Sequence, residues 1–389
     1  MDTSLFIASR LRFKGKIAMV CIAVSFLVMI VAVAISSGFR YELHSSLSEI
    51  SGDILLSTPD LNVMNESRPI DSSSPCMDYV ESSELVERVV PVTWRAGIVR
   101  HDGNMHGVVL KGVPSHPEFT DSVSLGVSVP RKLASASGLK VGDRMLTYFI
   151  GEEMKVRQFN VIDIHDSMVE TDDRYIVYAS LSDIQRLNGW DESQVSAIEI
   201  YLAEGIDSER EINEATQEIG TIVNLYQEDG DMIATSSVSR YPQLFGWLSL
   251  IDFNVGFILL LMTIVAGFNM ISGLLIMLFE HISTIGLLKS LGMTDKSIAK
   301  VFLSASAVLV GKGMAIGNGL AFVFCLIQKT THILKLNPEN YYVSFVPVKI
   351  NLGMILTADI LSFVVIMLLL LIPCIFISKV DPSQTVRVR

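Results

Sequence analysis

The sequence predicts an α-helical membrane domain of four transmembrane helices with a large α+β domain inserted between helices 1 and 2. Half of the 389 residues are hydrophobic and only 18% are charged, a composition outside that of ordinary soluble domains. The apolar residues also gather in four blocks, each long enough to cross the roughly 30 Å of hydrocarbon that about 20 helical residues span. These blocks are residues 17–39, 253–279, 301–328 and 350–378.

The blocks and the charges at their edges divide the chain into segments. We predict an amphipathic N-terminus at 1–16, helix 1 at 17–39, the inserted domain at 40–246, helix 2 at 250–279, a loop at 280–297, helix 3 at 300–328, a second loop at 329–350, helix 4 at 351–378 and a tail at 379–389. A basic start followed by an apolar run also describes a cleaved signal peptide. The 23 uncharged residues of helix 1 exceed the apolar region of about 7–15 residues in such peptides, which favours an uncleaved anchor.

Charge predicts the orientation in the membrane, because Lys and Arg are enriched in short cytoplasmic segments. Both ends of this chain are basic: Arg10, Arg12, Lys14 and Lys16 precede the first block, and Lys379, Arg387 and Arg389 follow the last. Residues 40–246 hold 16 Lys and Arg against 34 Asp and Glu, a net charge of −18. We therefore expect both termini in the cytoplasm and the acidic domain on the outer side. The basic residues of the loop 329–350 disagree with this orientation.

The inserted domain is predicted to mix strands and helices. Strands are expected at 52–58, at 93–113 as a hairpin turning at Asp102-Gly103, on both sides of a tight turn at Gly151, and at 157–165, 173–179, 197–202 and 221–226. Helices are expected at 79–89, at 129–138 ending in Gly138, at 180–189 capped by Ser180, and at 208–219. The Ser-, Asn- and Pro-rich segment 61–75 is expected to be a loop.

No catalytic or metal-binding pattern is visible in the sequence. His101, His106 and His116 match no zinc spacing, and the HExxH, GxSxG and GxxxxGK[ST] motifs are absent. Cys76 is the only cysteine outside the apolar blocks, so the inserted domain cannot form an internal disulfide. We expect a chain that is not an enzyme, binds no metal or cofactor, and, at a net charge of −11, binds no nucleic acid.

Two features lie inside the apolar blocks. Ser306, Gly313, Gly317 and Ala321 are spaced by seven, four and four residues, so they share one helical face on which another helix can pack closely. Lys312 and Asp359 are charges within predicted helices, where charges usually pair or face protein or water. At 1.5 Å per residue they lie about 18 Å and about 30 Å from the inner surface, so a direct pair requires the helices to slide or tilt. The alternative is that Lys312 snorkels or faces the bundle and Asp359 lies among the outer headgroups.

The loop "STIGLLKSLGMTDKSIAKVF", residues 283–302, predicts a helix, a turn and a second helix. Ile282, Ile285, Leu288 and Leu291 recur every three residues as an apolar stripe. Gly292 is placed to end the first helix, and Thr294 or Asp295 to cap the second. The pattern alone is typical of a helix that lies on lipid headgroups.

The segment "FNMISGLLIMLFEHISTIGLLKSLGMTDKSIAKVF" resembles FtsX/MacB-type ABC permeases, whose cytoplasmic turn reads roughly E-x-x-x-[DE]-I-[GA]-[IL]-L-[RK]-[AST]-[LV]-G. Four further stretches and "GLKVGDRM" extend the likeness over nearly the whole chain. They are "FIASRLRFKGK", "SGFRYEL", "LNPENYYVSFVPV" and "KVDPSQTVR", and they are similar to the lipoprotein-releasing LolC/LolE branch. In that family the chain is a membrane subunit without a P-loop, and its large domain is MacB-like, built of Porter and Sabre parts; the Sabre-like part here would be about 125–185.

The resemblance implies partners and a place in the cell. A separate LolD-like ATPase dimer would bind ATP and Mg²⁺, and this chain would bind neither. A second permease protomer, either the same chain or a LolC/LolE-like relative, would complete the membrane part. Lipoproteins would be extracted from the bacterial inner membrane, among its lipids, and passed to a LolA-like periplasmic carrier.

The resemblance also implies roles for particular residues. The first helix of the loop would be the coupling helix that contacts the ATPase, through Glu280, Ile282, Ile285, Gly286, Leu287, Leu288, Lys289, Leu291 and Gly292. The lipid-modified substrate would be held between the first two helices of paired protomers, at Ile30, Val33, Phe257, Leu261 and Ile264.

Two departures from the family pattern are visible. Thr284 stands at the second acidic position of the coupling motif, so Glu280 would serve alone. The tight turn at Gly151 replaces the longer carrier-grasping hook of LolC-type subunits, which implies a LolE-like role or carrier docking by another chain. A MacB-like efflux permease and an FtsX-like activator of a cell-wall hydrolase are the alternative functions, and an outer domain of about 200 residues disfavours the latter.

Overall fold

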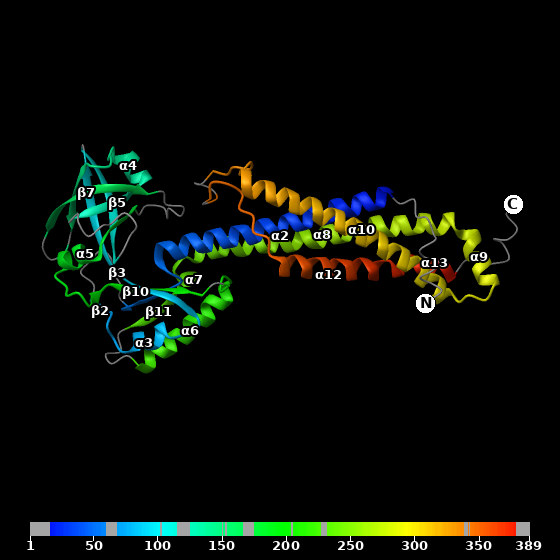
Figure 1. Ribbon diagram of the computed structural model, residues 1–389, viewed down its shortest axis with the longest axis horizontal. Helices are drawn as coiled ribbons and strands as arrows, with labels where there is room; N and C mark the ends of the chain where they lie inside the picture. Colours follow the sequence, from blue (N-terminus) through cyan, green and yellow to red (C-terminus); the bar gives the residue numbers. More distant parts are fainter. Residues whose placement is uncertain are drawn as a thin grey trace. The chain divides into compact units, whose positions relative to one another are not determined.

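The chain forms two compact units in the computed structural model (Figure 1). The helical unit is Met1–Arg40, Trp247–Leu336 and Phe345–Arg389, and the α+β unit is Tyr41–Gly246 and Asn337–Ser344. The structure describes residues 16–59, 68–101, 103–114, 125–149, 151, 154–165, 175–203, 205–226, 232–337, 341 and 343–378. His116, most of the predicted N-terminal segment and the tail 379–389 lie outside these ranges, as does part of the predicted loop 61–75.

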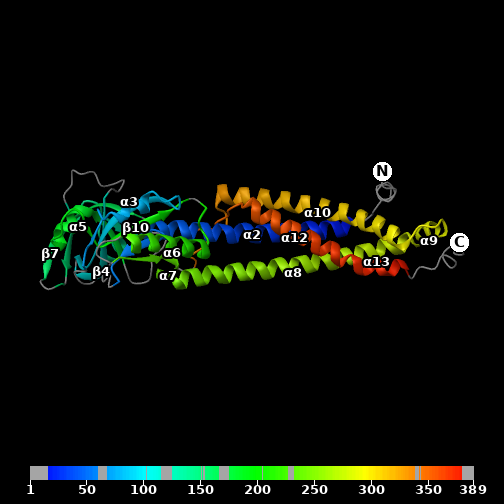
Figure 2. The same cartoon turned by 90° about the horizontal axis from the view of Figure 1, so that it is seen from below.

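Four helices of the described residues are long and apolar enough to cross a membrane, judged by length and composition. They are α2 (Lys16–Ser51), α8 (Pro242–Glu280), α10 (Asp295–Thr331) and the run of α12 (Leu352–Leu369) and α13 (Leu371–Ser378). Figure 2 shows the short α9 (Ile282–Ser290) where the chain turns from α8 back into α10. These helices agree with the four apolar blocks of the sequence.

The sequence predicted one continuous helix at 351–378, but the fourth apolar block forms two helices. α12 ends at Leu369, and α13 begins at Leu371. Pro373 explains the break, because proline has no N–H to donate to the carbonyl of Leu369 and its ring crowds that carbonyl. The prediction missed a proline that lies only two residues inside the second helix.

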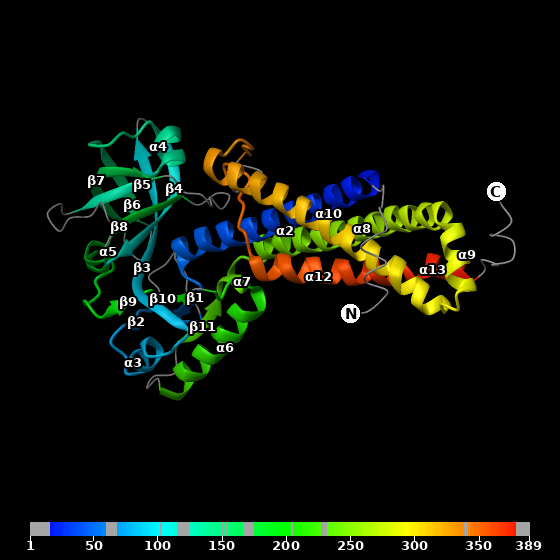
Figure 3. The same cartoon turned by 45° about the vertical axis from the view of Figure 1, so that its right-hand side comes forward.

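The α+β unit is built on a nine-stranded sheet with the order β11-β1-β10-β3-β4-β8-β5-β7-β6. Its strands are β1 (Ile54–Ser57), β3 (Val86–His101), β4 (Asn104–Val113), β5 (Gly126–Pro130), β6 (Arg144–Phe149), β7 (Lys155–His165), β8 (Tyr175–Ser180), β10 (Ala197–Leu202) and β11 (Ile233–Ser236). A separate pair is β2 (Ile70–Asp71) with β9 (Gln194–Val195), and the helices are α3 (Cys76–Glu81), α4 (Arg131–Ser137), α5 (Leu181–Asn188), α6 (Glu209–Tyr226) and α7 (Ser237–Arg240). Figure 3 shows α6 beside β11.

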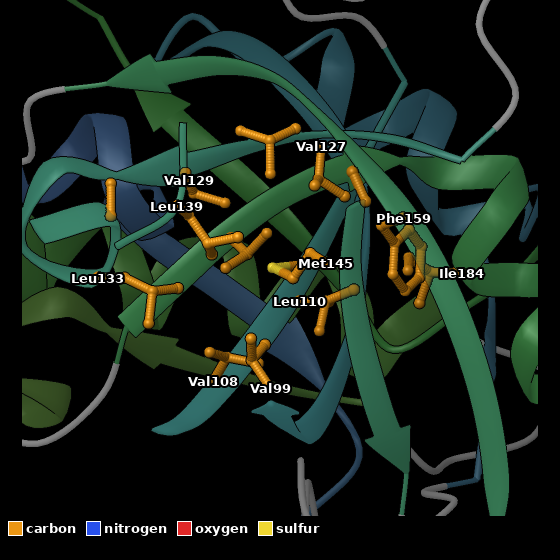
Figure 4. Packing of buried hydrophobic residues seen from close by; sticks show 14 of the residues in the cluster. Val99, Val108, Leu110, Val127, Val129, Leu133, Leu139, Met145, Phe159 and Ile184 are labelled. Atoms are coloured by element: carbon orange, nitrogen blue, oxygen red, sulfur yellow. The ribbon is translucent and has the colours of Figure 1, made fainter. Parts of the chain in front are cut away.

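The long strand β3 belongs to two parts of this sheet. Its first half pairs with β10, and its second half pairs with both β4 and β6. The additional β3–β6 pairing closes the strands β3, β4, β8, β5, β7 and β6 into a ring. Apolar side chains fill the ring, among them Val99, Leu110, Val127, Met145 and Phe159 (Figure 4). Burial of these side chains, each worth about 1.5–3 kcal/mol, holds the ring together.

Two predicted elements of the α+β unit are wrong. The helix expected at 79–89 ends at Glu81, and Val86 already begins β3 because its β-branched neighbours pair with β10. The strand expected at 221–226 is the last part of α6, where Ile219 and Val223 continue its buried face. In both cases tertiary pairing or packing decided a short apolar stretch whose local pattern fits either structure.

The connection between β6 and β7 is short. The two strands pair without interruption from Arg144↔Asn160 to Phe149↔Lys155. Only residues 150–154 lie between them, which leaves no room for a long extension at this place.

The N-terminus of α6 provides a first testable contact. Glu211 N donates to Ser208 Oγ over 3.3 Å, and Ser208 N donates to Glu211 Oε2 over 3.3 Å, the arrangement of a capping box. The Ser208 hydroxyl also donates to Glu211 Oε2 over 2.6 Å. The bond from Ser208 lowers the pKa of Glu211 below its ordinary value of 4.5. A group with a lowered folded pKa stabilises the fold above its unfolded pKa and loses that contribution as the pH falls through the folded pKa.

We therefore expect Ser208→Ala to destabilise the α+β unit by about 1 kcal/mol at pH 7 and by less at pH 3. The thermal unfolding midpoint of the full chain in detergent measures this. Ser180→Ala is the matched control, because Ser180 precedes α5 without a side-chain capping bond. Equal effects of the two substitutions at pH 7 would contradict the prediction.

Candidate functional site

The turn between α8 and α10 is built by strong local signals. α9 ends where Gly292 takes a left-handed backbone angle, φ +89°, which favours glycine. Gly292 N donates to Lys289 O over 2.9 Å, and Met293 N donates to Leu288 O over 3.0 Å. The Thr294 hydroxyl then accepts from Ser297 N and caps α10. The sequence therefore specifies a helix, a sharp turn and a second helix at this point.

The face of α9 that packs inward is not the whole predicted stripe. Ile285 is 1% exposed and joins a core cluster with residues of α8 and α10 such as Met277 and Phe302. Leu288 is half-buried against the same cluster. Leu291, by contrast, is 76% exposed. The predicted stripe is thus divided between the interior of the helical unit and the surface.

The outer face of α9 is a strip of exposed residues at helical spacing. They are Ser283, Thr284, Leu287, Ser290 and Leu291, which we call the α9 face. Leu287 is 55% exposed, so the strip presents two leucines to a partner. Lys289 Nζ is held 2.9 Å from Asp295 Oδ1 at the start of α10, which keeps the turn closed.

The other residues expected to contact a partner lie around this face. Glu280 and Gly292 are exposed, Ile282 is half-buried, and Gly286 is buried with Ile285. Ile285 and Gly286 therefore cannot form a direct contact surface, contrary to the expectation. Because Ile285 and Gly286 lie on the buried side of α9, the next residue, Leu287, lies on its exposed side.

The small-residue face of α10 packs against α2. Ser306, Gly313, Gly317 and Ala321 are all buried. A Cβ at Gly313 would lie 2.7 Å from Ile22 Cγ2, and one at Gly317 would lie 2.4 Å from Ala23 O. Because real Cβ atoms do not approach other atoms this closely, only glycine allows the two helices to contact at these positions.

The two charges predicted within the membrane helices do not pair with each other. Asp359 on α12 is 6% exposed, and its Oδ2 accepts a hydrogen bond of 2.6 Å from Asn318 Nδ2 on α10. Lys312 is exposed on α10, and no ion pair joins the two in the described part of the chain. The sequence pointed to Lys312, a charge near the middle of α10, and missed Asn318, a neutral residue among glycines.

The proposed substrate positions are not brought together within this chain. Ile30 and Val33 are buried in a cluster with Ala321 of α10 and Ile355 of α12, so they are core residues. Phe257, Leu261 and Ile264 are exposed on α8 instead. Of the residues expected to hold the substrate between paired protomers, those of α2 are thus buried within this chain and only those of α8 face outward.

An ion pair at the end of the helical unit was not predicted. Arg40 on α2 pairs with Asp252 on α8, and the Ser36 hydroxyl donates to the same carboxylate over 2.6 Å. Arg40 directly follows the first apolar block and Asp252 directly precedes the second, so both are expected on the same side of the membrane. Opposite charges in these two positions are a sequence signal from which the ion pair could have been predicted. They tie α2 to α8 where both leave the apolar layer.

The described residues contain no group of three or more His, Cys, Asp or Glu side chains that could hold a metal ion. His101 and His106, which lie on β3 and β4, are therefore not part of such a group.

The chain is similar to permeases in its sequence. Residues 256–382 match the family model described as FtsX-like permease C-terminal. Over 406 aligned residues the chain is 20% identical to the lipoprotein-releasing system transmembrane protein LolC of Neisseria meningitidis, with 96% of this chain and 94% of that protein covered. It is 19% identical, with the same coverage, to the protein of that name from Xylella fastidiosa.

Solved structures of isolated domains are more distant. The periplasmic region of MacB from Actinobacillus actinomycetemcomitans matches with a TM-score of 0.35 and 12% identity, covering 51% of this chain and 95% of that one. The extracellular domain of the transporter YknZ from Gram-positive bacteria matches with a TM-score of 0.31 and 12% identity, covering 47% and 99%. Because these TM-scores are low, the description of the α+β unit rests on its own strands and not on these structures.

Proposed function

We propose that this chain, which is a LolC/LolE-type permease, couples ATP hydrolysis by a separate ATPase to the extraction of lipoproteins from the bacterial inner membrane and their delivery to a periplasmic carrier. One observation carries the proposal. The likeness to proteins named as the transmembrane part of a lipoprotein-releasing system covers 96% of this chain, so it includes both units. As an ABC transporter permease, the chain leaves ATP and Mg²⁺ to its partner.

The α9 face is the proposed contact for a LolD-like ATPase dimer. Its two exposed leucines are suited to a partner groove, since a leucine transferred from water into such a groove contributes about 1.5–3 kcal/mol. The buried Ile285 and the closed turn at Gly292 hold this face on a rigid base. With α9 on the cytoplasmic side, both termini are cytoplasmic and the α+β unit is periplasmic.

The acyl chains of the substrate are proposed to contact α8. In the most apolar 18-residue stretch of α8, only 11% is buried within the chain, whereas 44% of the corresponding stretch of α2 is buried. Phe257, Leu261, Ile264 and Phe268 are exposed at spacings of four, three and four, which is one helical face. A second permease protomer would face the same helix and enclose the substrate. With a short β6–β7 connection, we propose that the other protomer docks the LolA-like carrier.

Site-specific crosslinking in the purified complex tests the release function. A photoreactive residue at Phe257, 58% exposed, is expected to trap an acylated lipoprotein in the presence of the ATPase. The same residue at Ile30, 0% exposed, is the control and should trap far less. Recovery of a cell-wall hydrolase alone would contradict the proposal and favour signalling. Export of a periplasmic peptide or toxin without lipoprotein capture would favour a MacB-like function.

A further inference from the structure

The last residues of α2 belong to the α+β unit. α2 ends at Ser51, and Gly52 follows with a left-handed φ of +61°. Gly52 N donates to Ser48 O over 2.8 Å, which closes the last turn. A helix end still leaves its last carbonyl groups without partners in the helix, and buried carbonyls need partners from elsewhere.

Two cations supply those partners, the buried Lys111 and the half-buried Arg240. Lys111 Nζ on β4 donates to Ile50 O over 2.6 Å. Arg240, the last residue of α7, donates from Nη1 to Ser51 O over 2.9 Å and from Nη2 to Gly52 O over 2.8 Å. The positive charges of the two side chains also interact favourably with the partial negative charge at the C-terminal end of the helix. Three successive carbonyls, the last two of α2 and that of Gly52, are thus held by side chains from two other elements.

A buried carboxylate balances Lys111. Glu199 on β10 lies 2.8 Å from Lys111 Nζ, and both side chains are 1% exposed. Tyr201 donates from its hydroxyl to the same Glu199 oxygen over 3.2 Å. Burial lowers the pKa of Lys111, and the charge of Glu199 opposes this shift. The pair therefore lies in a dry site where hydrogen-bond geometry is well defined.

The chain that follows α2 is bound to the same sheet. Asp53 N donates to Ile200 O over 2.9 Å, and Leu202 N donates to Asp53 Oδ2 over 2.9 Å. Ser237 N, at the start of α7, donates to Asp53 O over 2.7 Å. The helix end is consequently bonded on several sides to β4, β10 and α7.

We propose that Lys111, Glu199 and Arg240 are positioning residues that fix the end of α2 to the sheet, so that a displacement of α2 moves β10, β3 and β4 with it. A buried ion pair adds little stability compared with apolar residues of similar size, because desolvation offsets the attraction. Hydrogen bonds to three carbonyls are directional, so they set both the rotation and the axial position of the helix. Apolar contacts are not directional and do not fix these two quantities. The inference rests on the proposed function, in which ATP-driven motion reaches the α+β unit through helices such as α2.

The double variant Lys111→Met/Glu199→Met tests this inference in the full chain assembled with its ATPase in lipid nanodiscs. It removes the cation and its carboxylate together, so no unpaired charge is left buried. The matched control is Arg210→Met/Glu214→Met, which removes an exposed ion pair of 2.7 Å on α6. Amide hydrogen exchange of residues 47–53 and the number of lipoproteins released per ATP hydrolysed are measured.

We expect the double variant to exchange at least tenfold faster at residues 47–53, with β3 and β4 unchanged. Lipoprotein release per ATP should fall at least fivefold while ATP hydrolysis stays at the wild-type rate. If these side chains only stabilised the fold, the rate of ATP hydrolysis and the rate of lipoprotein release would fall together. The control variant should match the wild type in every measurement.

Two results would overturn the inference. One is wild-type exchange at residues 47–53 in the double variant, and the other is faster exchange with unchanged release per ATP. A wild-type complex that releases no lipoprotein would contradict the proposed function separately, and the exchange measurement would still decide whether these side chains hold the end of α2.

Discussion

Leu287→Asp is expected to abolish co-purification of the ATPase while the permease still inserts into the membrane. Leu287 is 55% exposed on α9, so a carboxylate there does not disturb the fold of the free chain. In the complex, loss of a buried leucine removes about 2 kcal/mol, roughly 30-fold in affinity, and a buried unpaired carboxylate weakens binding further. Affinity purification of the tagged permease from detergent, followed by quantification of the ATPase, measures the effect.

The control for this prediction is Leu225→Asp, the same change at a 71% exposed position of α6 in the α+β unit. It should leave the yield of ATPase unchanged. Leu288→Asp is a poorer probe, because Leu288 is half-buried against the cluster around Ile285 and a charge there destabilises the permease itself. Wild-type yield of the ATPase with Leu287→Asp would show that the α9 face is not its binding surface.

Gly317→Ala is expected to lower the thermal unfolding midpoint of the permease in detergent by several degrees. The added Cβ would lie 2.4 Å from Ala23 O, a backbone atom that moves only if α2 moves. Overpacking of this kind costs about 1–3 kcal/mol, and Gly317→Leu should prevent assembly of the bundle altogether.

Gly319→Ala provides the matched comparison on the same helix. Nothing lies within 4 Å of its ideal Cβ, so the better helix propensity of alanine should leave stability unchanged or raise it by up to about 1 kcal/mol. Equal midpoints for the two alanine variants would contradict the close packing of α10 on α2.

Local signals predicted the elements around α9 well. Gly292 ends the helix because glycine adopts a left-handed angle without cost, and Thr294 caps the next helix because its hydroxyl reaches a free backbone N–H. The strand at 197–202 is also found with the same bounds in β10. These features depend on a few neighbouring residues, so the sequence states them directly.

The predictions that were wrong depend on distant partners. The apolar stretch 221–226 extends α6 because Val223 packs on the face begun by Ile212. Asp359 meets Asn318 instead of Lys312, since the relative rotation of α10 and α12 places that amide beside it. The contacts of Lys111 with Ile50 and Glu199 join residues 61 and 88 positions apart, and no periodicity in the sequence indicates them.

The sequence by itself determined the apolar helices, the α+β character of the second unit, the turn at Gly292 and the likeness to LolC/LolE-type permeases. These follow from composition, periodicity and short motifs. Only the tertiary structure decided which face of α9 is free, because an apolar stripe fits a protein core and a partner equally well. Packing of Ile285 against α8 and α10 fills the core side and leaves Leu287 and Leu291 outside, available to a second protein.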